Sequence, residues 1–494
     1  MPDRSSLRVF VSVIVLWAFA LVGIMTSCEG KQQTGRSTET ATRNPAPVEA
    51  AAGSHSTLIG MQYETWFTPH NNRAYDTAEA IPMLGKYSSY NVAVLRKHEE
   101  WFEDMGINWL LLDWSNMLWT KPAWEEHKGA TRELEETTDL LFKTYSQLQK
   151  EGRHPPKLVI MLGLENGAPV PQGVERLNGI IAWLDKNFLD KPAYKDLWLD
   201  DHGKPLLTIL FNVGLPCQEI ARQTAGVVAP RWTVRWMGSQ LQNTHVEKCG
   251  FWSWMDGPIR QVVTYGASGA EEVVVTPSSF PIPGGWLDPR AVGRDHGAPY
   301  LESWEVAFES RPEFIQVHQW NEFAGQKEGE GFGPHHDIYG DEYNLELSDD
   351  IEPTDPHKCA YRGCGGWGYY YMNLTTALIS LYRHETPGIT VMALSSPFKP
   401  GVVKKPVLHL DWETIGQPPS SYTLRLDGKT VAKNLHGDKY ALDLLHARAG
   451  KHKVTLVANG VHTYFDLSPE KLAKKSSTPL PVTSAIEFTY SPGR

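Results

Sequence analysis

The sequence lacks the features that mark several large classes of protein. Basic residues are outnumbered by acidic ones, 47 to 57, so no excess of positive charge is available for a nucleic-acid backbone. Glycine and proline, at 42 and 34 of 494 residues, are too few for a collagen-like or low-complexity chain. Long apolar runs are also missing beyond the N-terminus. We therefore expect a folded chain that binds no nucleic acid. Its 18 tryptophans suggest stacking surfaces as well as packing.

Residues 1–28 are predicted to be a lipoprotein signal peptide. Two arginines precede an apolar run over 9–25, and the segment ends in Met-Thr-Ser-Cys28, which resembles the lipobox of bacterial lipoproteins. The resemblance implies that Cys28 is acylated, and that the protein is exported and lipid-anchored at the envelope of a Gram-negative bacterium, in the outer membrane or periplasm. The membrane would be contacted only through this anchor. An uncleaved anchor helix is the alternative. Residues 29–55 have the composition of a flexible tether.

Cysteine is rare in the remainder of the chain, where four occur: Cys217, Cys249, Cys359 and Cys364. In an exported protein these side chains could form disulfides, and Cys359 and Cys364 would close a short loop. Neither spacing resembles a pair of metal ligands. We expect no metal and no cofactor.

Short apolar runs alternate with longer helical patterns over residues 56–386. Most of the runs are apolar throughout, which is typical of parallel strands covered on both faces. The expected strands are 57–67, 109–114, 157–165, 206–212, 232–237, 250–255, 272–277 and 314–322. The expected helices are 91–105, 131–150, 173–188, 219–225, 301–309 and 367–383. This order predicts an α/β fold, a (β/α)8 TIM barrel. An open doubly wound sheet is disfavoured because no Gly-rich turn follows the first strand.

Residues 387–494 show the alternation of half-buried strands, which predicts a small C-terminal β-sandwich of the Ig-like kind. The expected strands are 407–413, 421–426, 440–444, 452–457, 461–467 and 485–490. Asp427-Gly428 and Asn459-Gly460 indicate hairpin turns. A structural brace is the favoured role of this accessory domain, and carbohydrate binding is the alternative.

Carboxylates, amides and indoles follow the predicted barrel strands, at the end where such barrels carry their active sites. The indole stacks on the apolar face of a pyranose, while amides and carboxylates bind its hydroxyls, and two carboxyl groups can cut a glycosidic bond. The candidates are Glu64, Trp66, Asp113, Trp114, Glu165, Asn166, Asn212, Trp236, Trp254, Asp256, His318, Trp320, Asn321 and Glu322. The pattern predicts a carbohydrate substrate.

Gln319-Trp320-Asn321-Glu322 is the most specific of these signals. It resembles the Trp-Asn-Glu/Asp element that glycoside hydrolase families 71 and 99 place at the end of the last barrel strand, and 350–353 resembles a stretch that follows it. The resemblance implies a barrel over 56–386 and the endo-acting α-mannanase or α-1,3-glucanase activities of these families. The resemblance also implies that Glu322 is a catalytic acid. The families carry a second acid three residues later, where this chain has Gly325.

The partner acid must therefore come from another strand end. Asp113 is the favoured partner, followed by Glu165, Glu64 and the loop residue Glu328. We expect Glu322 to act as proton donor or base, because an indole neighbour and partial burial disfavour a charged carboxylate. Glu165 is also a candidate acceptor for a substrate hydroxyl.

Both carboxyl groups of the favoured pair have a structural alternative. A buried pair with Arg235 is the alternative for Glu322, and a strand-end cap is the alternative for Asp113.

Two long connections, 278–299 and 323–366, are predicted to wall the substrate face. The acidic residues of the second are expected to be solvated. A calcium ion held by Asp337, Asp341 and Asp350 is a less favoured alternative, and a hydrolytic metal at His335-His336-Asp337 is disfavoured because adjacent histidines point apart.

The predicted function is that of a glycoside hydrolase that degrades a polysaccharide or oligosaccharide. A non-catalytic glycan-binding surface lipoprotein is the first alternative, favoured by Gly325. A polysaccharide lyase built on Tyr63, His318 and Arg235 is the second.

Overall fold

The computed structural model of the chain describes thirteen stretches. They are residues 56–165, 170–211, 215–239, 249–255, 257, 260–281, 285–325, 327–331, 335–339, 342–383, 390–395, 402–466 and 474–493. The predicted signal peptide 1–28, with Cys28, and the tether 29–55 lie outside these residues. Within the described part, no helix combines the length and the apolar character needed to cross a membrane.

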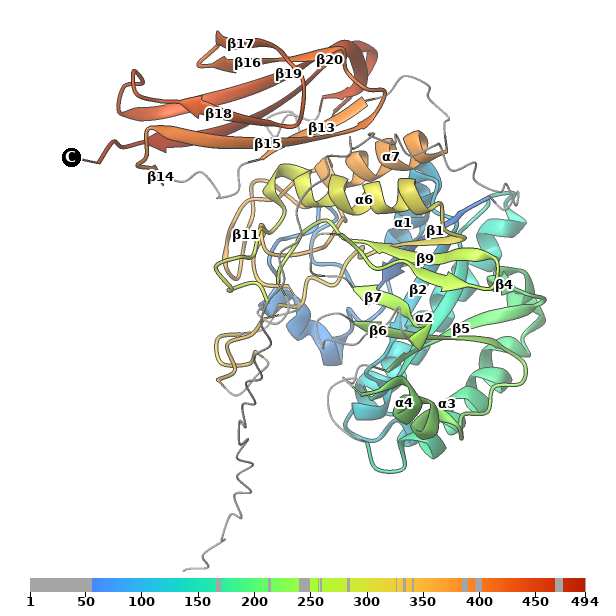
Figure 1. Cartoon of the computed structure of the whole chain (residues 1–494). Helices are drawn as coiled ribbons and strands as arrows, with labels where there is room; N and C mark the ends of the chain where they lie inside the picture. Colours follow the sequence, from blue (N-terminus) through green and yellow to red (C-terminus); the bar gives the residue numbers. More distant parts are fainter. Residues whose placement is uncertain are drawn as a thin grey trace, which may run out of the picture. The chain divides into compact units, whose positions relative to one another are not determined.

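Eight parallel strands form the barrel (Figure 1). They are β1 (Leu58–Tyr63), β2 (Trp109–Trp114), β3 (Lys157–Glu165), β5 (Lys204–Phe211), β6 (Thr233–Ser239), β7 (Trp252–Met255), β9 (Gly269–Val275) and β10 (Phe314–Val317). The sheet runs in the order β7-β6-β5-β3-β2-β1-β10-β9, with every neighbouring pair parallel. Two short strands extend it, namely β4 (Asp200–Asp201) on β5 and β8 (Thr264–Gly266) on β9, both antiparallel.

Side chains connect the two ends of this sheet. The backbone N–H of Ser253 in β7 donates to Glu272 Oε2 in β9 at 3.0 Å, and the Gln316 amide donates to the Trp254 carbonyl at 2.9 Å. The sheet is therefore a nearly closed parallel barrel. The predicted (β/α)8 barrel fold is confirmed, with each of the eight expected strands present.

Helices connect most of the barrel strands. They are α1 (Val92–Met105), α2 (Gly129–Lys150), α3 (Gly173–Leu184), α4 (Cys217–Thr224), α6 (Ala298–Ser310) and α7 (Tyr370–Tyr382). Shorter 3-10 or π-helical segments lie at Pro69–Asp76, Met117–Trp119, Trp124–Glu126, Asp185–Leu189, Pro192–Leu197 and Asp295–Gly297. Helix α1 begins where the Asn91 side chain accepts the N–H of Ala93, and it ends at Gly106, whose φ of 81° suits glycine.

Alternation along β2 divides two hydrophobic clusters. Trp109 and Leu111 belong to a cluster with side chains from β3, β5 and β7, whereas Leu110 and Leu112 pack among side chains of the helices. The barrel interior is tight, because a Cβ placed on Gly60 would lie 2.1 Å from the Trp109 ring. This alternation directs the next inward position, Asp113, toward the barrel axis.

The C-terminal part forms a β-sandwich, as predicted (Figure 1). One sheet contains β13 (Thr390–Ser395), β15 (Val407–Gly416) and β18 (Lys439–Asp443). The other contains β14 (Val402–Val403), β20 (Lys474–Tyr490), β19 (Gly450–Asp466), β16 (Ser421–Leu426) and β17 (Lys429–Leu435). Both sheets contribute to one hydrophobic cluster.

One of the two predicted hairpin turns is confirmed. Asp427 and Gly428, with φ of 50° and 78°, connect β16 to β17. The other prediction is wrong, because Asn459 and Gly460 lie inside β19, where the pairing with β20 shifts register.

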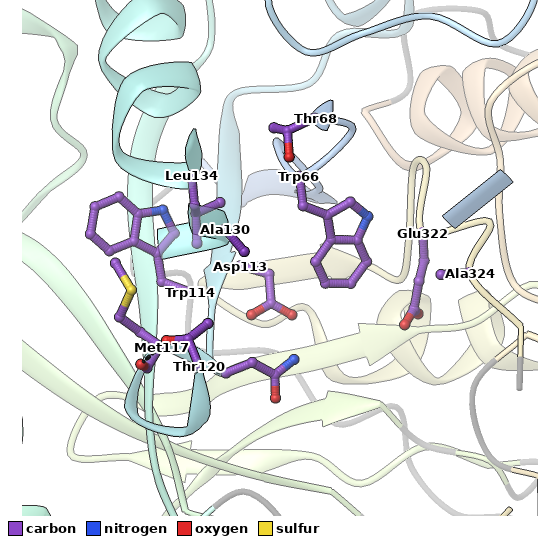
Figure 2. Close-up of a pocket in the computed structure, with 11 residues that line it drawn as sticks. Trp66, Thr68, Asp113, Trp114, Met117, Thr120, Ala130, Leu134, Glu322 and Ala324 are labelled. Carbon is purple, nitrogen blue, oxygen red and sulfur yellow. Dashed lines mark hydrogen bonds between the residues drawn. The ribbon is translucent and has the colours of Figure 1, made fainter. Parts of the chain in front are cut away.

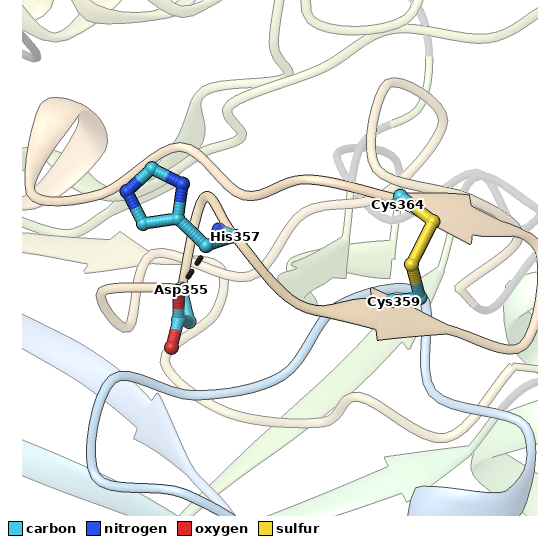
Figure 3. The surroundings of a disulfide bond; sticks show 4 residues. All are labelled: Asp355, His357, Cys359 and Cys364. Atoms are coloured by element: carbon cyan, nitrogen blue, oxygen red, sulfur yellow. Dashed lines mark hydrogen bonds between the residues drawn. A yellow bond between two sulfur atoms is a disulfide. The ribbon is translucent and has the colours of Figure 1, made fainter.

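Two disulfides are present, Cys217–Cys249 and Cys359–Cys364. The second joins the short strands β11 (Cys359–Ala360) and β12 (Gly363–Cys364), as Figure 3 shows. Both pairs are thus formed, which the sequence analysis had left open.

Candidate active site

A hollow of about 350 Å³ lies at the carboxyl ends of β1, β2 and β10 (Figure 2). Its lining residues are Trp66, Thr68, Asp113, Trp114, Asn116, Met117, Thr120, Ala130, Leu134, Glu322 and Ala324. In Figure 2 the ring of Trp66 stands between the carboxyl groups of Asp113 and Glu322. Two acids from opposite halves of the barrel sequence thus line the same hollow, beside an indole that is only partly buried.

Asp113 reaches the hollow because it continues the inward-facing alternation of β2. Its side chain is 6% exposed, and its Oδ1 accepts the backbone N–H of Ser115 at 2.6 Å. Burial raises the pKa of Asp113 to about 6, although the hydrogen bonds from Ser115 act in the opposite direction. Asp113 therefore does cap the end of β2, as the structural alternative expected. This cap coexists with a carboxyl group that titrates near neutral pH.

Glu322 follows β10 and is held from two directions. The Gln319 side-chain amide donates to Glu322 Oε2 at 2.5 Å. The backbone N–H groups of Glu322 and Phe323 donate to the two carboxylate oxygens of Asp350, at 2.5 and 2.7 Å. These bonds fix the orientation of the Glu322 carboxyl group and the path of its backbone.

The alternative of a buried pair between Glu322 and Arg235 is wrong. Arg235 lies on β6 and forms ion pairs with Asp201 at 3.1 Å and Glu271 at 2.7 Å. Its charge is therefore neutralised by two other carboxylates.

Asn321 and Glu64 connect β10 to the end of β1 and do not line the hollow. Asn321 is fully buried, accepts the N–H of Glu64 at 2.8 Å and donates to the Tyr87 hydroxyl at 2.9 Å. Glu64 is 1% exposed, and burial, followed by the negative charges of Asp113 and Glu322, raises its pKa. Both residues were predicted to contact substrate. In the structure they lie behind the lining of the hollow and connect two strand ends.

The expected ring of tryptophans is wrong in most of its members. Trp320 is fully buried, with its ring centroid 4.8 Å from that of Phe102, so it belongs to the hydrophobic core. Trp114 points toward the helices, where its indole N–H donates to Thr138 at 3.0 Å, and it offers the hollow only an edge at 1% exposure. Trp66 is the accessible indole of this set in the described hollow.

Two other predicted tryptophans lie away from the hollow. Trp254 is 9% exposed and contacts the ring of His318, with centroids 5.2 Å apart. Trp236 lines a separate hollow with residues 227–230 and stacks on Phe251. Neither side chain contributes to the lining around Asp113.

His318 is also buried, at 1% exposure, and its Nδ1 lies 2.7 Å from Gln62 Oε1. Burial lowers the pKa of His318 to about 3, so the ring is neutral. Tyr63 is committed to a hydrogen bond with His98 at 3.0 Å. The Tyr63, His318 and Arg235 set expected of a lyase is therefore not assembled.

Several predicted residues lie outside what the structure describes. They are the side chain of Glu165 and all of Asn166, Asn212, Asp256 and Cys28. Glu328, the last of the candidate partner acids, is exposed and pairs with Arg362 at 3.3 Å.

Gly325 occupies the position of the second acid in the resembled families. A Cβ added there would lie 2.6 Å from the Glu342 carbonyl oxygen and 2.9 Å from that of Thr77. Backbone atoms therefore occupy the space that a side chain needs. The departure from the family pattern is enforced by packing.

The long connection after β10 is only in part the solvated acidic loop that we expected, because Glu328, Glu330 and Asp337 are exposed but four other acids are buried. Glu342, Asp349, Asp350 and Glu352 are 2–3% exposed. Tyr87 donates to Glu352 at 2.6 Å, and Ser278 donates to Asp349 at 2.5 Å. Asp350 binds the backbone at Glu322, a role that the sequence analysis did not give it, although it singled out the stretch 350–353.

No family model and no curated protein matches the chain. Among solved structures, the family GH99 endo-α-mannosidase of Bacteroides thetaiotaomicron matches at 18% identity and a TM-score of 0.44, covering 66% of this chain and 99% of its own. The endo-β-1,4-mannanase of Thermotoga petrophila matches at 10% identity and a TM-score of 0.43, and the match covers 89% of this chain and 99% of the mannanase. The β-glucuronidase of Bacteroides uniformis matches at 11% identity and a TM-score of 0.41, and the match covers 89% of this chain and 46% of the glucuronidase. The matched proteins are glycoside hydrolases, and at these values the matches assign no activity or residue to this chain.

Proposed function

We propose that the protein is a glycoside hydrolase that cleaves a polysaccharide or oligosaccharide, with Asp113 and Glu322 as its carboxyl pair. The observation that carries this proposal is that both acids line one hollow beside the partly exposed Trp66. Hydrolysis of a glycosidic bond requires two carboxyl groups facing one sugar, and an indole provides the stacking surface. The volume of about 350 Å³ lies within the range of small-molecule sites.

We assign the role of proton donor to Asp113, which leaves Glu322 the other role that the sequence analysis allowed for it, that of base or nucleophile. The pKa of Asp113, about 6, keeps a share of the carboxyl groups protonated near neutral pH. The sequence argument for Glu322 as donor relied on Trp320, whose ring is buried against Phe102. Glu322 then acts as the carboxylate that attacks the anomeric carbon or deprotonates a water.

Polar side chains of the loop after β2 are placed to bind sugar hydroxyls. Asn116 and Thr120 line the hollow on the side of Asp113, and Thr68 lines it beside Trp66. Amide and hydroxyl groups of this kind donate and accept hydrogen bonds with the same ligand.

We also propose that Cys28 carries the lipid anchor of an exported enzyme, on the basis of the lipobox-like end of residues 1–28. Expression of the full chain and of Cys28→Ser in a Gram-negative host tests this. We expect the first in the membrane fraction with an acylated N-terminal peptide, and the variant in the soluble fraction. Equal membrane content of the two would contradict the anchor.

A glycan-binding protein without hydrolytic activity is the second candidate. The observation that favours it is the packing at Gly325, which excludes the second acid of the resembled families. Retention on glycans without release of reducing ends would support this alternative.

The test is a screen of the protein against α- and β-linked glycans, in parallel with Glu322→Gln and Asp113→Asn. We expect either substitution to lower kcat by about 10³-fold or more. Glu330→Gln and Asp104→Asn are matched controls, because both side chains are exposed and neither lines the hollow. Turnover by Glu322→Gln equal to that of the controls would remove Glu322 from the mechanism.

A further inference from the structure

Three buried acids, Glu79, Glu342 and Asp350, meet at a place that the proposed reaction does not use. Each offers a carboxylate oxygen, and these oxygens all lie within 4.8 Å of one another. The side chains are 3%, 2% and 3% exposed, and none of them lines the hollow at Asp113. The group combines one acid from the segment after Pro69–Asp76 with two from the connection that follows β10.

The charges of this group are poorly balanced by the protein. Asp349 adds a fourth buried carboxyl group, and Arg294 is the cation whose charge acts on all four acids. Buried carboxylates in such excess require protons or a bound cation.

Two oxygen atoms in this group have no hydrogen-bond partner among the described residues. One is Oε2 of Glu79, whose side chain is only 3% exposed. The other is the amide oxygen of Gln319, a fully buried side chain outside the acidic set. The Gln319 amide nitrogen donates to Glu342 Oε1 at 2.9 Å, so the amide end lies against the acids. The unpaired carboxylate oxygen of Glu79 is of the kind that a hard cation such as Ca²⁺ binds.

The backbone holds the acids together without the help of an ion. Asp355 N–H donates to the Ile81 carbonyl at 2.7 Å, and Tyr361 N–H donates to the Ala78 carbonyl at 3.1 Å. Glu79 lies between these two anchored positions. Both Glu342 oxygens accept the N–H of Asp349, at 3.1 and 3.0 Å.

We propose that Glu79, Glu342 and Asp350 bind a divalent cation, and that Ca²⁺ fits best. All the offered ligands are oxygens, and Ca²⁺ accepts six to eight of them at about 2.3–2.6 Å in flexible geometry. Two oxygens bound to one such ion lie at most about 5 Å apart, and the three carboxylate oxygens, all within 4.8 Å of one another, meet this requirement. Mg²⁺ requires shorter bonds and near-octahedral geometry.

This site differs from the calcium alternative considered from the sequence. That alternative used Asp337, Asp341 and Asp350, but Asp337 is exposed and Asp341 lies outside the described residues. Asp350 is the shared ligand. Glu79 and Glu342 replace the two other aspartates, and Glu79 is available because the fold brings its segment against the connection after β10.

A cation here would stabilise the backbone at Glu322. Asp350 accepts the N–H groups of Glu322 and Phe323 with the same carboxylate that would bind the ion. Each carboxylate oxygen has two lone pairs, so it can accept a hydrogen bond and bind a metal together. The ion is structural, and its binding is independent of whether the protein hydrolyses glycans.

The experiment measures metal binding to the purified full-length protein after treatment with EDTA. We expect calorimetric titration with CaCl₂ to give one site per chain, and saturating Ca²⁺ to raise Tm by about 5 °C. MgCl₂ at equal concentration should give a smaller shift. Glu79→Gln should weaken Ca²⁺ binding by about tenfold or more, because it removes one ligand charge. Glu330→Gln removes the same charge from an exposed side chain on the connection that contains Glu342 and Asp350, and it is the matched control.

Absence of Ca²⁺ uptake and of any Tm shift at about 5 mM CaCl₂ would overturn the site, since even weak extracellular calcium sites fill near 1 mM. The acids would then be neutralised by shared protons. Wild-type Ca²⁺ affinity in Glu79→Gln would also overturn it, and an equal shift with Mg²⁺ would contradict the choice of ion. The wild-type measurements decide the question even where the variant fails to fold. Glycan hydrolysis is measured separately, so the two proposals can fail independently.

Discussion

The carboxylate of Asp350 accepts the backbone N–H of Glu322 at 2.5 Å, across 28 residues of sequence. The same carboxylate accepts the next N–H, that of Phe323, at 2.7 Å. A buried anion therefore fixes the chain where the barrel presents its candidate carboxylate. The position of Glu322 depends on a residue that does not line the hollow.

Asp350→Asn should lower kcat more than it changes KM. An amide group offers one oxygen where two N–H groups now find acceptors, so one of them is left unpaired, at a cost of about 1–3 kcal/mol. The Glu322 backbone would shift, while Trp66 and Asp113 keep their places. Steady-state kinetics and urea unfolding of the two proteins check this. A change confined to KM would contradict a positioning role.

The stability of the protein should fall as pH rises from about 4 to about 6. Burial raises the pKa of Asp113 from 3.8 to about 6, so in this window the folded state binds more protons than the unfolded state. The contribution of Asp113 to folding is therefore most favourable at low pH and is lost as its folded-state carboxyl ionises. The shift corresponds to about 3 kcal/mol.

Asp113→Asn should lack this component, because an amide does not ionise. Urea unfolding at pH 4, 6 and 8 measures the difference between the two proteins, and Asp104→Asn is the exposed control. A difference that stays constant over this range would show that Asp113 is ionised throughout.

Trp66→Ala should act mainly on KM, and Trp320→Ala mainly on stability. Trp66 is partly exposed in the hollow and packs against a hydrophobic cluster, so its loss should raise KM for a glycan and destabilise the protein less than the loss of Trp320. Trp320 is fully buried, and its loss should reduce the free energy of unfolding by about 3–5 kcal/mol. Kinetics and thermal unfolding of both variants check this. Equal destabilisation by the two would contradict the assignment of Trp66 to the hollow.

Gly325→Ala should destabilise the protein by about 1–3 kcal/mol, because its methyl group would meet two backbone carbonyl oxygens at 2.6 and 2.9 Å. Gly363→Ala is the control, since nothing lies within 4 Å of a Cβ at that position. Urea unfolding measures both. A neutral Gly325→Ala would show that the surrounding backbone can yield, and that this position could accept a side chain.

The barrel strands could be predicted because each is buried on both faces and therefore reads as a continuous apolar run, as in Trp109-Leu110-Leu111-Leu112. The absence of the second hairpin turn, by contrast, could not be predicted from the sequence. Asn459-Gly460 has the composition of a turn, but pairing with β20 continues past it and turns it into a bulge.

The sequence by itself determined the barrel and the sandwich, since apolar runs and two-residue alternation are local properties of the chain. Only the tertiary structure decided which tryptophans reach solvent and which acids meet. Trp66 and Trp320 have the same side chain, and Glu79 and Glu330 carry the same charge, but their burial differs. Burial and charge depend on neighbours brought from distant segments, and a linear pattern does not contain those neighbours.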